Sequence, residues 1–154
     1  MAWRVRTRDD GLVLPLPAGW IGVHATDDVA ASARAHPVLR EACGPVLAVP
    51  TGDGRRWLFL AEVDESVLSS TELPDGVGLI RPPRELLLPP SSNDFGMIRW
   101  AVCPSPEKRW LPTATTVVSA LREVISPRRH VRWLRTRPVD EWYRPGTTGT
   151  TRDR

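Results

Sequence analysis

A pair of consecutive prolines near the middle of the chain restricts its fold more than any other feature. The apolar run Leu86-Leu87-Leu88 ends in Pro89-Pro90, and a polar loop, a glycine and a second apolar run ending at Trp100 follow. Proline donates no backbone hydrogen bond, so a sheet strand has to stop there. The segment therefore predicts a hairpin whose loop, residues 91–94, is a common kind of place for a binding site.

The abundance of helix breakers predicts many short elements. The 154 residues include 16 prolines and 11 glycines, yet 41% of the residues are hydrophobic, enough for the core of one domain. We find neither a signal peptide nor an apolar run of about 20 residues, so we expect a cytoplasmic protein without a membrane span. Cys43 and Cys103 lie far apart, which excludes a CxxC redox or zinc site.

Turn and capping signals place the elements. Strands over 45–49 and 55–60 flank the turn signal Thr51-Gly52-Asp53-Gly54, which predicts a hairpin. A helix is expected from about Asp28, capped by Thr26 or Asp27, and Pro37 either interrupts it or starts a second helix. A further turn is predicted at 73–76, and a helix follows Thr113 and ends before Pro127.

These elements predict an α+β fold. We expect a mixed, mostly antiparallel sheet of hairpins, flanked by two or three helices, in a single domain over residues 1–143. Residues 144–154 are polar and lack core-forming side chains, so this tail is expected to be disordered.

The basic residues are unusual in kind and in placement. The chain has twenty arginines and one lysine, which reflects either a GC-rich coding bias or the preference of arginine for bidentate phosphate contacts. Residues 126–154 hold eight arginines against three acidic residues, a net charge of +5, while the whole chain carries +3. Positive charge is therefore concentrated at the C-terminal end.

Two blocks of sequence resemble the prim-pol domain of bifunctional DNA primase/polymerases, a branch of the archaeo-eukaryotic primase superfamily. In that family a Gly-rich turn leads into a strand with a histidine and an aromatic residue, and a later strand ends in Pro-Pro-Ser before a glycine and an aromatic strand. The matching blocks here are Thr51–Phe59, and Leu88–Ser91 with Gly96 and Trp100. They span about residues 44–104, and the resemblance implies a primase/polymerase-like sheet in which the Trp57 and Leu88 strands are neighbours.

The chain departs from the family at the catalytic positions. The resemblance implies an upstream strand carrying two aspartates that hold Mg²⁺ or Mn²⁺, and we find no such strand. The acidic pairs Asp9-Asp10 and Asp27-Asp28 each start an apolar or helical segment instead. The family histidine is replaced by Trp57 or Arg56. We therefore expect a degenerate relative with no catalytic residues, no metal ligands and no cofactor, and an enzyme only if those aspartates converge on the hairpin.

The candidate DNA- or nucleotide-binding residues are polar side chains beside the two blocks and basic side chains near the C-terminus. Each has a second interpretation. The arginines at the turn are then solvated turn residues, the serine is an ordinary strand-ending residue, and the C-terminal arginines form the basic face of a packed element. Trp57 and Trp100 are either core residues or a base-stacking platform. No ligand spacing for zinc links the three histidines. The candidates are Arg55, Arg56, Ser91, Arg99, Arg128, Arg129 and Arg132.

Two functional hypotheses follow. The first is a non-catalytic primase/polymerase-like domain that binds DNA or nucleotide. The second is a protein-interaction or regulatory module that buries its tryptophans and Pro-rich edges against a protein partner or in a homodimer. An active primase or polymerase is the third and least favoured interpretation.

Overall fold

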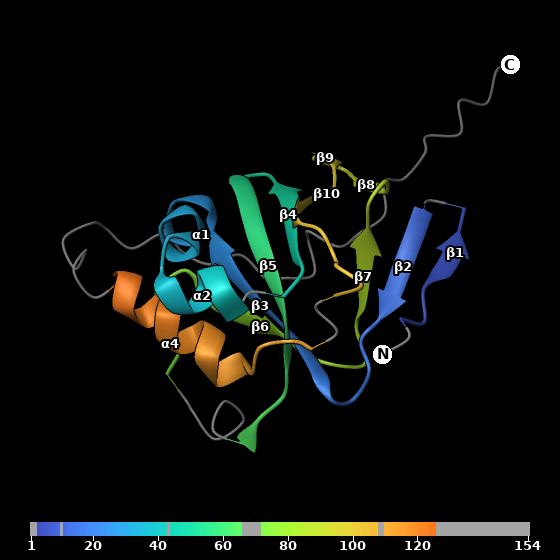
Figure 1. The fold of residues 1–154 in the computed structure, drawn as a ribbon. Coiled ribbons are helices and arrows are strands. Elements are labelled where there is room, and N and C mark those ends of the chain that lie inside the picture. The colour runs from blue at the N-terminus through green and yellow to red at the C-terminus, as the bar shows by residue number, and fades with distance from the viewer. Residues whose placement is uncertain (1–2, 10, 43, 66–71, 108–109, 126–154) are drawn as a thin grey trace, which may run out of the picture.

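A five-stranded antiparallel sheet organises the fold (Figure 1). The computed structural model describes residues 3–9, 11–42, 44–65, 72–107 and 110–125. The strand order is β10-β4-β5-β3-β6, and every neighbouring pair is antiparallel. The strands are β3 (Trp20–Thr26), β4 (Val46–Thr51), β5 (Gly54–Glu62), β6 (Val77–Ile80) and β10 (Arg99–Val102).

Strand β3 lies inside this sheet, and the sequence analysis did not predict it. Ile21, Val23 and Ala25 alternate with smaller or polar residues and are fully buried on the helix side of the sheet. This period of two is typical of a strand, but a glycine and a histidine at the intervening positions obscured it. Asp27 follows β3 directly and starts α1, as expected for an acidic pair at the start of a helical segment.

Three helices among the described residues cover one face of the sheet. They are α1 (Asp27–Arg34), α2 (Pro37–Ala42) and α4 (Ala114–Ile125). The Thr113 hydroxyl accepts a hydrogen bond from the Thr116 N–H (3.2 Å) and so caps α4. The segment β3-α1-α2-β4 returns to the sheet with β5 between its two strands, a split β-α-β arrangement. The predicted α+β class and the predicted helices are confirmed.

A smaller sheet covers the opposite face. It has the order β1-β2-β7, with β1 (Arg6–Arg8), β2 (Gly11–Pro15) and β7 (Glu85–Leu88). Leu14 and Leu86 from this sheet pack with Leu47, Leu58 and other buried side chains of the five-stranded sheet. Figure 1 shows the larger sheet between the helices and the smaller sheet. The molecule therefore has two apolar layers, one on each side of the central strands.

The expected hairpin from Leu86 to Trp100 is wrong. Strand β7 pairs with β2, and β10 pairs with β4. Between them the chain forms only the short hairpin of β8 (Ser92–Asn93) and β9 (Gly96–Met97). An apolar run predicts that a strand exists but leaves its partner open. The Trp57 and Leu88 strands, expected to be neighbours, therefore lie in separate sheets.

Candidate functional site

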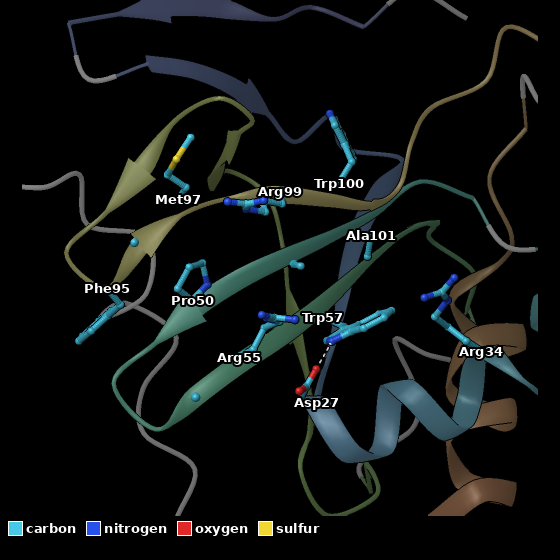
Figure 2. Close-up of a pocket in the computed structure, with 13 residues that line it drawn as sticks. Asp27, Arg34, Pro50, Arg55, Trp57, Phe95, Met97, Arg99, Trp100 and Ala101 are labelled. Carbon is cyan, nitrogen blue, oxygen red and sulfur yellow. Dashed lines mark hydrogen bonds between the residues drawn. The ribbon is translucent and has the colours of Figure 1, made fainter.

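A groove with a volume of about 750 Å³ lies on the helix side of the sheet, where β4, β5 and β10 extend beyond α1 (Figure 2). Its floor includes Pro50, Arg55 and Arg99, and Trp57 closes its inner end. Two walls enclose this floor. Asp27 and Arg34 of α1 form one wall, and Phe95, Gly96 and Met97 of the β8–β9 hairpin form the other.

Strand alternation explains why these side chains share a face. Arg55 and Trp57 are two positions apart on β5, so they point to the same side of the sheet. Ala48 of β4 pairs with both Trp57 and Arg99, which brings Arg99 to that side as well. The β4–β5 turn, which the sequence predicted, therefore places Arg55 over the floor of the groove.

A carboxylate, an indole and a guanidinium form a contact network at the inner end of the groove. The Trp57 Nε1–H donates a hydrogen bond to Asp27 Oδ1 (2.5 Å). The Arg34 guanidinium lies over the Trp57 ring, 5.2 Å from its centroid, which is a cation–π distance. Trp57 itself is only 8% exposed. The indole therefore fixes the position of Asp27 and supports Arg34.

Two arginines on the groove floor present their charge to solvent. Arg55 and Arg99 are exposed. Within the described part of the chain neither forms an ion pair, whereas Arg6, Arg8 and Arg56 do. With Arg34 at the wall, the groove holds three guanidinium groups against the single carboxylate of Asp27. Such a surface attracts anionic ligands.

The outer wall is held in place by Asn93, a buried residue of the polar loop. Its Nδ2 donates to the Pro50 carbonyl (2.9 Å), and its Oδ1 accepts from the Phe95 N–H (3.0 Å). These bonds tie the β8–β9 hairpin to β4. Phe95 is 44% exposed, and its ring lies against Gly52, where an added Cβ would be 3.1 Å from Phe95 Cε1. The loop therefore presents one aromatic ring in a fixed position.

Removing this brace is expected to loosen the wall. We expect Asn93→Ala to lower the free energy of unfolding by about 1 to 3 kcal/mol, because it leaves the half-buried Pro50 carbonyl without its amide donor. Chemical denaturation measures this loss, and amide hydrogen exchange at Phe95 should accelerate. Asn93→Asp, which retains the acceptor for the Phe95 N–H, should protect that amide better than alanine does. Unchanged exchange at Phe95 in the alanine variant would contradict the bracing role.

Arg56, a candidate binding residue, does not line the groove. It lies on the other face of β5, is 5% exposed, and donates to Asp53 Oδ2 (3.1 Å) and to the Gly76 carbonyl (3.3 Å). The hydrogen bond from the Thr51 hydroxyl and the Arg56 charge hold the pKa of Asp53 below its ordinary value. Arg56 therefore stabilises the β4–β5 turn against the turn before β6.

Ser91, another candidate binding residue, forms hydrogen bonds within the fold. It is 3% exposed, and its hydroxyl accepts from the Leu12 N–H (2.7 Å) and donates to the Leu12 carbonyl (3.2 Å). The Pro-Pro-Ser motif thus joins the end of β7 to β2. Trp100 is among the residues that line the groove, but its ring points away from Trp57 in Figure 2 and meets Trp3 edge-on, with 6.1 Å between ring centroids. Trp57 belongs to the buried core on the helix side, whereas Trp100 is half-buried against the opposite core.

The remaining predicted residues lie elsewhere. Arg128, Arg129, Arg132 and the tail 144–154 are outside the described residues, as is Asp10. Of the other acidic residues considered, Asp27 reaches the groove, whereas Asp9 lines a separate hollow between β1 and the Ser91 loop. Sequence reasoning missed Arg34 and Phe95 as groove residues, although Arg34 is seven residues after Asp27, two turns along the same helix face.

The described residues include no group of three or more His, Cys, Asp or Glu side chains placed to share a metal ion. Within the same residues, no helix has the length and apolarity needed to cross a bilayer. No protein-family model, curated protein or solved structure matches the chain.

Proposed function

We propose that this chain is a non-catalytic, primase/polymerase-like domain that binds nucleic acid in the groove over β4, β5 and β10. The observation that carries the proposal is the pair of exposed arginines, Arg55 and Arg99, on the floor of a groove with an aromatic rim. Guanidinium groups bind phosphate oxygens in bidentate geometry, and an exposed ring offers a surface on which a base stacks. Arg34 adds a third positive charge at the wall.

The sequence resemblance supports this proposal through its motifs alone. The two strands that carry the motifs were expected to be neighbours but lie in separate sheets, so the sheet topology does not support the proposal. Both motifs nevertheless frame the groove. The turn before Trp57 supplies Arg55, and the segment after Pro-Pro-Ser supplies Phe95 and leads into Arg99.

Catalysis is not part of the proposal, and the reason is the surroundings of Asp27. Nucleotidyl transfer by two metal ions requires carboxylates that bridge the ions. Asp27 accepts the indole N–H of Trp57 in a groove that three arginines also line, so its carboxylate is arranged as a hydrogen-bond acceptor within a cationic groove. We therefore propose that the domain binds nucleic acid without incorporating nucleotides. We also propose that the protein acts in the cytoplasm.

The test is the salt dependence of binding by the double variant Arg55→Gln/Arg99→Gln. Each phosphate contact to a single strand contributes about 0.7 to the slope of log K against log salt, so the slope should fall by about 1.4. Affinity at low salt should fall about 10- to 100-fold. Fluorescence anisotropy with a dye-labelled mixed-sequence DNA 12-mer measures both quantities.

A matched control removes the same charge elsewhere. Arg40 on α2 and Arg81 after β6 are exposed and outside the groove. The variant Arg40→Gln/Arg81→Gln should therefore retain most of the affinity. Equal losses in both double variants, or no binding by the wild-type chain at low salt, would refute the proposed function.

A protein-interaction module is the second candidate, and one observation favours it. Phe95 and Met97 are neighbouring apolar side chains on the β8–β9 hairpin, 44% and 54% exposed. Such side chains are enriched at protein interfaces. If this hairpin forms a homodimer, light scattering should give twice the monomer mass, and Met97→Glu should return the monomer.

A further inference from the structure

We infer that the groove selects for an unpaired guanine base, with Asp27 as the residue that recognises its Watson–Crick edge. This inference rests on the proposed function and adds a base preference to it. It follows from an acidic side chain that is held in a fixed position within a groove otherwise lined with cationic side chains.

The position of Asp27 is determined by two elements at once. It is the first residue of α1 and follows β3, where Ala25 pairs with Trp57 of β5. That pairing brings the Trp57 indole to the carboxylate, and Oδ1 accepts the indole N–H at 2.5 Å. Figure 2 shows the carboxylate between the start of α1 and the Arg55 side chain. Asp27 is therefore a preoriented acceptor rather than a freely rotating surface acid.

The charge of Asp27 is also not neutralised by the arginines around it. Among the residues that the structure describes, no ion pair links Asp27 to Arg34, Arg55 or Arg99. A phosphate would be repelled at the Asp27 end and attracted over Arg55 and Arg99. The groove consequently has a polarity, with phosphates on the strand floor and a hydrogen-bond donor group next to α1.

Guanine is the base whose edge fits a carboxylate. An ionised carboxylate only accepts hydrogen bonds. Guanine presents two adjacent donors, N1–H and the N2 amino group, so it can meet both oxygens at once, since Oδ1 keeps a second lone pair. Adenine and cytosine each place a ring-nitrogen acceptor beside their amino group, and thymine flanks its N3–H with two carbonyl oxygens. These acceptors would face the negative charge. The guanine edge has to be unpaired to be read in this way.

The experiment compares four DNA oligomers that differ at one position. Each is a dye-labelled dT 11-mer with dG, dA, dC or dT at its centre, titrated into the wild-type chain and into Asp27→Asn. We expect the wild-type chain to bind the dG oligomer about tenfold more tightly than the other three, within the usual range for a bidentate base contact. Asp27→Asn should lose that preference and bind the other three oligomers as tightly as before or more tightly, because a negative charge is gone.

The control variant is Asp28→Asn, which removes the same charge from the neighbouring exposed residue. It should keep the dG preference. The asparagine at position 27 retains an amide oxygen for the Trp57 indole, and a thermal melt checks that it folds. The wild-type comparison among the four oligomers tests the inference even if that variant unfolds.

The outcomes separate the inference from the proposed function. Equal binding of all four oligomers by the wild-type chain overturns the guanine preference and leaves nucleic-acid binding intact. Loss of the preference in Asp28→Asn as well overturns the role of Asp27. Tighter binding of the matching RNA oligomers regardless of base would assign Asp27 to ribose hydroxyls and overturn the inference. Absence of binding to every oligomer refutes the proposed function itself.

Discussion

Gly11→Ala is expected to lower the free energy of unfolding by about 3 to 5 kcal/mol, from backbone strain and a steric clash together. Gly11 has a φ of +137°, a conformation that side chains with a Cβ rarely adopt. A Cβ added there would lie 2.1 Å from Ser91 Oγ and 3.1 Å from the Ser91 backbone Cα. The variant therefore has to separate the Ser91 loop from β2 and break the two hydrogen bonds to Leu12.

Chemical denaturation measures the effect, and Gly19→Ala is the matched control. A Cβ at Gly19 would have no neighbour within 4 Å, so that variant should change stability by less than about 0.5 kcal/mol. A difference between the two variants below about 1 kcal/mol would show that the Ser91 loop does not pack on β2 as described.

Acidification is expected to destabilise the protein through His24. Burial, and secondarily the charge of Arg56, lower the pKa of His24 from 6.5 to about 4. The unfolded chain therefore binds a proton below about pH 6.5, whereas the folded chain resists it until about pH 4. The contribution of neutral His24 to the free energy of unfolding is fully present above pH 6.5. It is lost as the pH falls from 6.5 to 4, because only the unfolded chain takes up the proton there. The loss amounts to about 3 kcal/mol.

The measurement is the free energy of unfolding at pH 7 and pH 4.5 in the wild-type chain and in His24→Gln. Because carboxylates also titrate in acid, the informative quantity is the difference between the two pH dependences. We expect the glutamine variant to lose about 2 to 3 kcal/mol less between these pH values. Gln is chosen because a Cβ at Gly78 would lie 2.2 Å from His24 Nε2, so the site tolerates no bulkier side chain. Parallel curves would refute the buried, neutral state of His24.

Local signals in the sequence predicted the elements well because their causes are local. The Gly52-Asp53 turn and the Thr113 cap depend on neighbours in the chain, and the structure confirms both. Of the two alternatives left open at Pro37, the structure shows the start of a second helix, α2. Strand partners depend instead on which apolar faces meet in three dimensions. That is why the partner predicted for Leu86–Leu88 is wrong.

The candidate site was predicted in part for the same reason. Of the candidate arginines, Arg55 and Arg99 line the groove, whereas the neighbouring Arg56 points to the opposite face. A strand turns alternate side chains to opposite sides, so which arginine faces the groove depends on which side the helices cover. Asp27 came to the groove through the pairing of β3 with β5, a contact between residues about thirty positions apart.

The two-sided use of β5 limits how this protein can diverge. Trp57, Phe59 and Ala61 belong to the helix-side core, and Leu58 and Leu60 to the opposite one. Losing one residue within the strand would move side chains of one set to the other face and disrupt the two apolar layers. During evolution, the ligand preference of this protein can therefore change through substitutions of side chains in β5. Insertions and deletions are confined to the connections outside this strand.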